Sequence, residues 1–184
     1  NDNAAYYVLV EAMGASQEQL EAILEQTLEA ELIVDAVVSQ SSQQTDQLWA
    51  LRDDVAQAFQ FAPVFLFDVS LRLSEMAAYV DAVNAGLTAR FDAPKNFVLG
   101  HVGDGNLHFA IAVGGDSPAQ REGVEAAVYE PLIAIQGSVS AEHGVGLEKK
   151  PYLHFVRDEA EIQLMRTIKA AMDPRGILNP GKIF

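Results

Sequence analysis

The chain has 184 residues, of which 49% are hydrophobic, and it carries a formal net charge of −14 at pH 7. This length suits one large domain or a compact pair of lobes, and no uncharged apolar run approaches the roughly 20 residues of a membrane-spanning helix. The acidic charge without a basic stripe argues against a nucleic-acid partner. The absence of cysteine excludes disulfides, thiolate metal sites and cysteine nucleophiles.

Strand-like and helix-like patterns alternate along the first 71 residues. Three segments have the apolar pattern of buried strands: 6–12 (YYVLVEA), 32–39 (LIVDAVVS) and 62–71 (APVFLFDVSL). Between them we expect two helices. One covers 17–31 and begins with a capping box of Ser16 and Gln19, and the other extends from the SSQQTD turn to about Phe59. Because the chain opens almost directly on a core strand, we expect a piece of a longer protein.

The remaining elements are predicted from caps, turns and periodicity. Ser74 caps one helix, and Ser117 with Pro118 begins another that ends near Gly137. The predicted strands are 95–102 and 106–113, joined by a short Gly-Asp-Gly turn. In SVSAEHG, at 138–144, we expect a short strand that runs into a glycine-broken loop. An amphipathic helix over 158–174 precedes an irregular tail.

The predicted order of elements is β-α-β-α-β-α-β-β-α-β-α. Helical returns between strands ordinarily indicate a parallel sheet, but a short turn makes the 95–113 hairpin antiparallel. We therefore expect an α+β fold with ferredoxin-like halves, in which helices pack on one face of a mostly antiparallel sheet.

The stretch GHVGDGNLH, at 100–108, holds two of the four histidines. In a strand, residues of equal parity share a face, so His108 points away from the apolar residues of its strand. His101 ends the preceding strand, and a hairpin would bring both imidazoles to one ion. The glycines allow a tight turn and leave room for a ligand. The alternative is a tight turn with two structural histidines beside it.

A second polar stretch, SAEHGVG at 140–146, places Glu142 beside His143. Neighbours in extended chain point to opposite sides, so one side chain can bind a metal while the other faces a substrate. Two histidines and a carboxylate are a familiar ligand set for zinc, manganese or iron. A polar loop with glycine turns is the alternative. His154 lacks such neighbours, and we interpret it as structural.

Three cations could meet an anionic substrate. Arg52 lies on a predicted helix near Trp49, and an arginine can bind a carboxylate through two parallel hydrogen bonds. The alternative for Arg52 is a surface ion pair with Asp53 or another nearby carboxylate. Lys149 and Lys182 lie near glycine-rich loops, where solvated side chains are the simpler interpretation.

Three motifs at compatible spacing resemble the C-terminal domain of FAD-linked oxidases: GHVGDGNLHFAI, SAEHGVGLEKKPYL and the ending MRTIKAAMDPRGILNPGKIF. LWALRDDV and FDVSL match the same pattern in order, so the resemblance covers the chain from Tyr6 to Phe184. It indicates the branch of the vanillyl-alcohol oxidase superfamily with D-2-hydroxyglutarate dehydrogenase, D-lactate dehydrogenase and the FAD subunit of glycolate oxidase. The resemblance implies that residues 1–184 are the substrate-binding domain of a two-domain enzyme. Its N-terminal domain, which is not in this chain, binds FAD.

The resemblance also implies a reaction and a site. The reaction is the FAD-dependent oxidation of a D-2-hydroxy acid to the 2-oxo acid, with hydride transfer to flavin. The ligands of a divalent metal, zinc or manganese, match three residues: His101, His108 and Glu142. His143 matches the proposed catalytic base, while Asn106 and Arg52 match residues near the substrate carboxylate.

The implied partners are a small 2-hydroxy acid and the N-terminal FAD domain, whereas the electron acceptor stays unknown. A homodimer is compatible with the resemblance, and no nucleic acid is expected. We expect a cytoplasmic protein, with peripheral attachment to a membrane as an open alternative.

Two positions depart from the pattern of the related 2-hydroxyglutarate enzymes. These enzymes have a lysine two residues before the aspartate of DVSL, where it meets the distal carboxylate of the substrate, and this chain has Leu66. The usual proline after SL is Arg72 here. A monocarboxylate, or a diacid that is held differently, is therefore as compatible with the sequence as 2-hydroxyglutarate.

Two other function classes use the same residues. A metal-dependent hydrolase could activate water on two histidines and a glutamate with an open coordination position. A non-catalytic α+β binding module could keep the fold and use the acidic surface for partners. A flavin domain upstream would exclude the hydrolase, and the intact His101, His108, Glu142 and His143 argue against the binding module.

Overall fold

The computed structural model describes residue 4, residues 6–101 and residues 103–184. The chain divides into two compact units, Asn1–Gln57 and Ala58–Phe184. None of the helices in the described residues is long and apolar enough to cross a membrane.

The first unit contains two helices, α1 (Gln17–Glu29) and α2 (Ser42–Asp53). The predicted capping box is confirmed, because the Ser16 side chain accepts a hydrogen bond from the Gln19 N–H and the Gln19 side chain accepts one from the Ser16 N–H. The second predicted helix is shorter than expected. It ends at Asp53, and a 3-10 helix, η1 (Val55–Phe61), follows it.

The predicted strands 6–12 and 32–39 are wrong, since the structure describes every residue of both segments and neither forms a strand. A strand requires a paired neighbour for its backbone groups and a covered face for its apolar side chains. Here the apolar side chains face solvent: Tyr6, Val8 and Leu32 keep 77%, 74% and 75% of their surface exposed. The apolar pattern of these segments is therefore not sufficient to form a strand.

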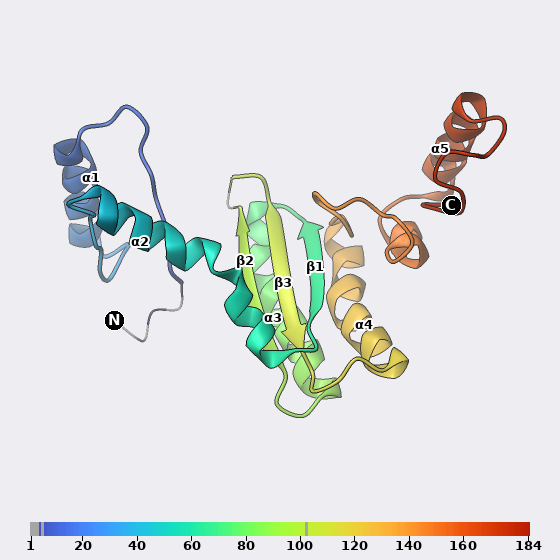
Figure 1. Cartoon of the computed structure of the whole chain (residues 1–184), viewed down its shortest axis with the longest axis horizontal. Helices are drawn as coiled ribbons and strands as arrows, with labels where there is room; N and C mark the ends of the chain where they lie inside the picture. Colours follow the sequence, from blue (N-terminus) through green and yellow to red (C-terminus); the bar gives the residue numbers. More distant parts are fainter. Residues whose placement is uncertain (1–3, 5, 102) are drawn as a thin grey trace. The chain divides into compact units, whose positions relative to one another are not determined.

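The second unit is built on a three-stranded antiparallel sheet with the order β1-β3-β2 (Figure 1). Its strands are β1 (Phe65–Ser70), β2 (Lys95–His101) and β3 (Asn106–Ala112). The predicted β2–β3 hairpin is confirmed, and its register pairs His101 with Asn106. Residue 102, which the sequence assigned to the first strand of the hairpin, lies outside the described residues.

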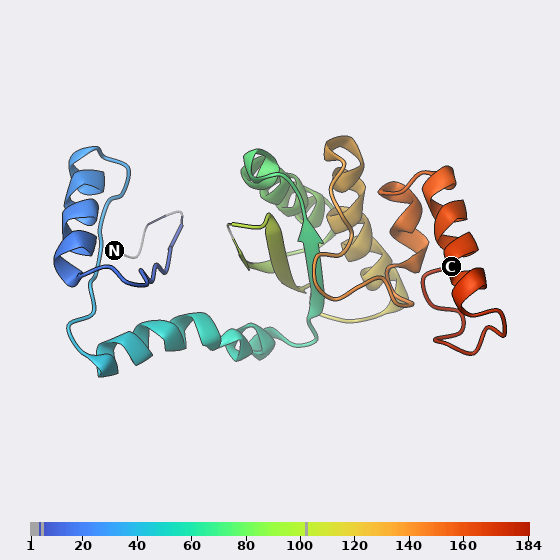
Figure 2. The same ribbon diagram turned by 90° about the horizontal axis from the view of Figure 1, so that it is seen from above.

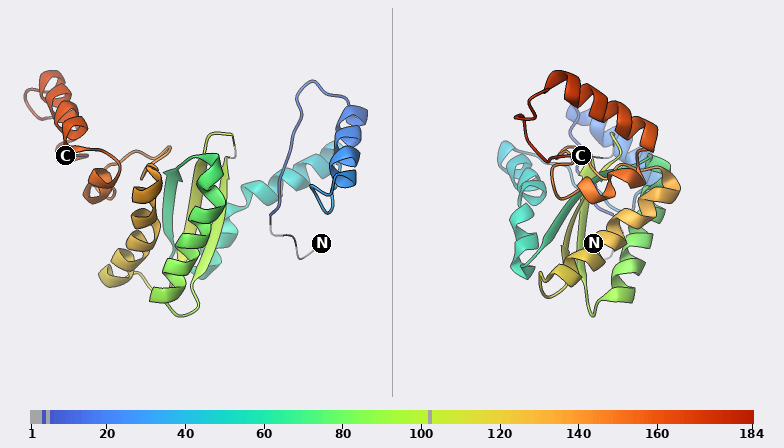
Figure 3. Two further views of the ribbon diagram at one scale, coloured as in Figure 1. Left: turned by 180° about the vertical axis from the view of Figure 1, so that it is seen from behind. Right: turned by 90° about the vertical axis from the view of Figure 1, so that its right-hand side faces the viewer.

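Two helices, α3 (Met76–Arg90) and α4 (Pro118–Ile135), pack on one face of this sheet. Figure 2 shows both on the same side, and α3 lies in front of the strands when they are seen from behind (Figure 3). The core contains the inward residues of the sheet and of both helices, including Val69, Phe109, Ile111, Val83 and Val128, each at most 1% exposed. The α+β class with helices on one face of an antiparallel sheet is confirmed.

The connection β1-α3-β2-β3-α4 is that of the ferredoxin-like β-α-β-β-α-β motif without its last strand. The short strand predicted within 138–144 is reduced to a single antiparallel bridge between Ser138 and Ser70, and the predicted loop follows it. The predicted cap of α3 is wrong. Ser74 lies within a short 3-10 helix, η2 (Leu73–Glu75), and Glu75 precedes α3 without a side-chain cap.

The C-terminal part contains a 3-10 helix, η3 (Lys150–Phe155), and the predicted amphipathic helix α5 (Glu159–Met172). Asp158 and Glu161 form a capping box at the start of α5. The tail beyond α5 has no regular secondary structure, as expected.

Candidate metal and substrate site

The β2–β3 turn brings His101 and His108 together. Asp104 donates its backbone N–H to the His101 carbonyl at 3.3 Å, and its carboxylate accepts the Asn106 N–H at 3.2 Å. Gly105 has a φ of 75°, and a Cβ there would overlap the Leu71 carbonyl oxygen, so the turn requires glycine. The two imidazole rings lie 5.5 Å apart, nearly perpendicular at 84°.

Glu142 reaches this histidine pair from the loop after α4. Its two carboxylate oxygens lie 3.8 Å from His101 Nε2 and 3.4 Å from His108 Nε2. One donor atom from each of the three residues lies within 4.8 Å of the other two. Two imidazole nitrogens and a carboxylate oxygen fit zinc or manganese. The three side chains are 20–53% exposed, which leaves the open side that a substrate needs.

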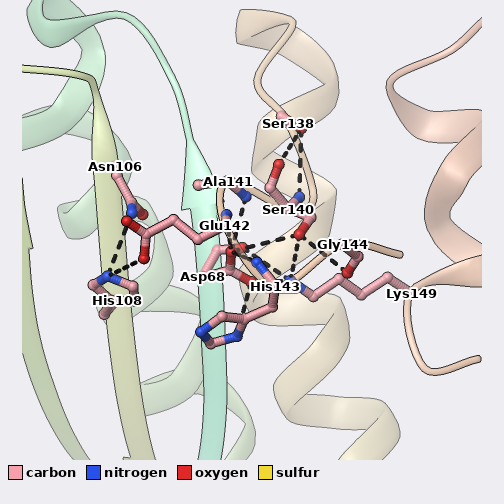
Figure 4. Close-up of polar contacts among 10 residues, drawn as sticks. All are labelled: Asp68, Asn106, His108, Ser138, Ser140, Ala141, Glu142, His143, Gly144 and Lys149. Carbon is pink, nitrogen blue, oxygen red and sulfur yellow. Dashed lines mark hydrogen bonds and ion pairs between the residues drawn. The ribbon is translucent and has the colours of Figure 1, made fainter. Parts of the chain in front are cut away.

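Asp68 is a residue of β1, and its side chain is fully buried against the loop that carries Glu142. Its Oδ2 atom accepts hydrogen bonds from three consecutive backbone N–H groups, those of Ala141, Glu142 and His143, at 2.9, 2.6 and 2.9 Å (Figure 4). Lys149 Nζ forms an ion pair with Oδ1. Burial alone would raise the pKa of this carboxyl, but the bonds from Lys149, His143 and Glu142 outweigh it and lower the pKa below its ordinary value.

His143 leaves the loop next to Glu142, and its ring lies beside Asp68 (Figure 4). Its Nδ1 atom lies 3.3 Å from Asp68 Oδ1, its side chain is 56% exposed, and its ring lies 5.9 Å from the ring of His108. Glu142 therefore reaches the histidine pair, and the ring of His143 lies near His108 and stays exposed to solvent.

Asn106 is buried within the same cluster, at 2% exposure. Its Nδ2 atom lies 3.3 Å from His108 Nε2, and its Oδ1 atom has no hydrogen-bond partner among the described residues. An unpaired buried carbonyl is costly, so a ligand that donates a hydrogen bond to it would be stabilised.

Five of the six predicted site residues converge in the second unit, and Arg52 is the exception. Arg52 belongs to the first unit, where it forms an ion pair with Asp53 at 2.8 Å. This is the alternative that the sequence left open for it. His154 contacts the Phe155 ring and lies outside the cluster of His101, His108 and Glu142.

Sequence reasoning misses two functional residues. Lys149, for which the sequence favours a solvated side chain, is 6% exposed and bonded to Asp68. Asp68 stands out in the sequence only as part of FDVSL. The signal that could have revealed it is a carboxylate inside an otherwise apolar strand, because a charge is rarely buried without a partner.

A family model described as "FAD linked oxidases, C-terminal domain" matches residues 1–183. A D-2-hydroxyglutarate–pyruvate transhydrogenase of Saccharomyces cerevisiae is 38% identical over 96% of this chain and 38% of its own length. D-2-hydroxyglutarate dehydrogenases of Stutzerimonas stutzeri and Bos taurus are 35% and 37% identical to this chain. Both alignments cover 97% of this chain, and they cover 40% and 34% of the length of the two relatives. The chain thus spans less than half of each relative. With a matching family model along nearly its whole length, this chain belongs to the FAD linked oxidases, as their C-terminal domain.

Proposed function

We propose that this chain is the substrate- and metal-binding domain of an FAD-dependent dehydrogenase that oxidises a D-2-hydroxy acid to the 2-oxo acid. The observation that carries the proposal is the convergence of His101, His108 and Glu142 next to His143. Family membership supports FAD as the cofactor, held mainly by an N-terminal domain. The names of the relatives, which specify D-2-hydroxyglutarate, support the substrate class.

The residues of this chain would bind and deprotonate the substrate. When bound, a zinc or manganese ion on His101, His108 and Glu142 lowers the pKa of the substrate hydroxyl, and FAD accepts the hydride. His143 removes the hydroxyl proton, a role that suits an imidazole at neutral pH. Asn106 would contact the substrate within the cluster, whereas Arg52, which pairs with Asp53 in the first unit, is proposed for the substrate carboxylate from the resemblance alone.

The residues on the face of the sheet that carries the site indicate which kind of substrate side chain fits there. Leu66 shares this face with Asp68 and is 56% exposed, and Leu99 pairs with His108 and is 45% exposed. Both would offer an apolar surface beside the metal ligands. We therefore propose a 2-hydroxy acid with an uncharged side chain, with a diacid that is held differently as the alternative.

Cellular location and assembly complete the proposal. We propose a cytoplasmic protein, while the relative from Bos taurus is named as mitochondrial. A homodimer and peripheral attachment to a membrane are compatible with this function, and the electron acceptor stays open.

The first experiment is the rate of flavin reduction by a D-2-hydroxy acid in the flavin-containing holoenzyme. His143→Asn should lower this rate by about 10²–10⁴-fold, because a general base is removed. The metal content should stay near that of the parent, since His143 is not a ligand. A parental rate in His143→Asn would place the base elsewhere. A holoenzyme that hydrolyses esters but never reduces flavin would favour the metal-dependent hydrolase.

The second experiment tests the substrate side chain. Leu66→Lys should raise the ratio of kcat/KM for D-2-hydroxyglutarate over D-lactate by about tenfold or more, because an ammonium can pair with the distal carboxylate. Leu66→Met is the matched control and should leave the ratio unchanged. An equal ratio in both variants would mean that the substrate side chain does not reach β1.

A further inference from the structure

We propose that Asp68 is a positioning residue that sets the orientation and the tautomer of His143. This inference rests on the proposed function, in which His143 removes the hydroxyl proton. Asp68 itself is fully buried, and no hydrogen bond or ion pair joins its side chain to that of His108 (Figure 4). It can act only through the loop and through the imidazole of His143.

The first contact is between one carboxylate oxygen and the backbone. Oδ2 accepts the N–H groups of Ala141, Glu142 and His143 and receives a further bond from the Ser140 hydroxyl at 3.4 Å. Three consecutive N–H groups that converge on one oxygen hold the backbone of these residues in a single conformation. In Figure 4 the side chains of Glu142 and His143 both leave the loop on the side of His108, with the His143 ring beside Asp68.

The second contact is between the other carboxylate oxygen and the imidazole. Oδ1 lies 3.3 Å from His143 Nδ1. An ionised carboxylate only accepts hydrogen bonds, so the ring must present its proton on Nδ1. The lone pair is then on Nε2, away from Asp68, where it can receive the substrate proton. A carboxylate that holds a catalytic histidine in its productive tautomer acts in the same way in serine hydrolases.

Lys149 keeps Asp68 ionised, so that the carboxylate remains an acceptor. Its Nζ atom pairs with Oδ1 and also lies 3.2 Å from the Asp68 carbonyl and 3.0 Å from the Ser140 hydroxyl. No contact joins Lys149 to the His143 side chain among the described residues. Lys149 therefore compensates a buried charge, whereas Asp68 also aims the ring.

The rival explanation is a buried ion pair that only stabilises the fold. The double variant Asp68→Asn/Lys149→Met separates the two, because it removes both charges together and leaves no unpaired ion. The asparagine oxygen can still accept the three N–H groups. Its amide group, however, replaces Oδ1 and donates to His143 Nδ1, which moves the ring proton to Nε2 and blocks the base.

The experiment uses the flavin-containing holoenzyme. For Asp68→Asn/Lys149→Met we expect kcat to fall by about 10²–10⁴-fold, with KM and metal content close to the parent's. Lys149→Met alone removes the cation that keeps Asp68 ionised and should lower both kcat and Tm, whereas Lys149→Arg keeps a cation and should retain kcat within about tenfold. In a His143→Asn background, the double variant should cause no further loss, because both changes act on one group.

Three outcomes would overturn the proposal: parental kcat in the double variant, a loss of kcat that follows a loss of metal, or an additive loss in the His143→Asn background. A readout that needs no Asp68 variant is the ¹⁵N spectrum of the histidines in the parent. The signals that disappear in His143→Asn should show a protonated Nδ1 and an unprotonated Nε2, and the opposite tautomer would also overturn it. If His143→Asn itself reduces flavin at the parental rate, the proposed function fails, whatever the tautomer shows.

Discussion

The three proposed metal ligands differ in the exposed fraction of their side chains. His108 is the most enclosed, at 20%, whereas His101 and Glu142 are 40% and 53% exposed. The enclosed imidazole also contacts the side chain of Asn106, at 3.3 Å. His108 thus links the metal ligands to the buried carboxamide, and Glu142 closes the set from a separate loop.

At the residue scale, we predict that this ligand set binds zinc or manganese. His108→Ala and Glu142→Ala should each weaken metal affinity by at least about tenfold, because each removes one donor atom. The measurement is calorimetric titration of metal-stripped holoenzyme with each ion. His154→Ala is the control and should bind as tightly as the parent. If neither ligand variant differs from the control, the cluster does not hold the metal.

At the scale of elements, the β2–β3 turn is the part of the fold on which the site depends most. Gly105 needs a positive φ and has no room for a side chain, whereas a Cβ added at Gly103 would meet nothing within 4 Å among the described residues. The two glycines stand in the same turn, one in a crowded position and one in an open position. They offer a matched pair for testing the turn.

We predict that Gly105→Ala destabilises the protein by more than about 1 kcal/mol, since alanine is strained in the left-handed conformation and also meets the Leu71 carbonyl. Metal affinity should fall with it, because His101 and Asn106 are displaced. Gly103→Ala should be close to neutral in both respects. Thermal unfolding and metal titration of the two variants check this. Equal effects of the two substitutions would contradict the role of Gly105.

The end of α5 provides a pH-dependent element. Asp173 accepts hydrogen bonds from Lys169 Nζ at 2.6 Å and from the backbone N–H groups of Leu178 and Ile177 at 2.9 and 3.0 Å. The bond from Lys169, followed by that from Leu178, lowers the pKa of the Asp173 carboxyl below its ordinary value. This carboxylate thereby ties the irregular tail to the last turn of α5.

A depressed carboxyl pKa contributes stability that is fully present above the unfolded value, near 3.9, and is lost as the pH falls through the folded value. Asp173→Asn should therefore lower Tm by a few degrees at pH 7, and the difference from the parent should shrink below about pH 4. Calorimetric scans of both proteins between pH 7 and pH 2.5 measure this. A difference that is constant with pH would show that the charge of Asp173 does not stabilise the tail.

At the scale of the whole molecule, the two units differ in how far they bury their apolar residues. The second unit has a continuous core, whereas the described helices of the first unit contain no buried residue. The net charge of −14 helps to keep such a molecule in solution. A chain with this much exposed apolar surface in one unit is compatible with a domain that works beside another.

We predict that the 184-residue chain alone is colourless and does not oxidise a D-2-hydroxy acid. The reason is the proposed division of labour, in which another domain holds most of the flavin. The measurement is the visible spectrum of the purified chain, followed by a dye-reduction assay with D-lactate and D-2-hydroxyglutarate. Stoichiometric flavin and turnover from this chain alone would contradict that division.

Local rules explain which elements could be predicted from the sequence. The capping box of α1 and the β2–β3 hairpin follow from side chains a few residues apart, and both are confirmed. The predicted strands at 6–12 and 32–39 rest on apolar pattern alone. Pattern does not supply a pairing partner, and both segments remain without strand structure.

The same distinction applies to the site. The sequence by itself determined the pair His101 and His108, because one short turn joins them. The opposite orientation expected for Glu142 and His143 assumes extended chain, whereas residues 141–143 form bends and both side chains lie near His108. Only the tertiary structure decided that Lys149 is buried against Asp68, 81 residues away in the chain. Burial and ion pairing at that separation depend on how the sheet, α4 and the following loop pack together. The spacing of residues along the sequence does not predict that packing. The role proposed for Asp68 could therefore be inferred only from the folded protein.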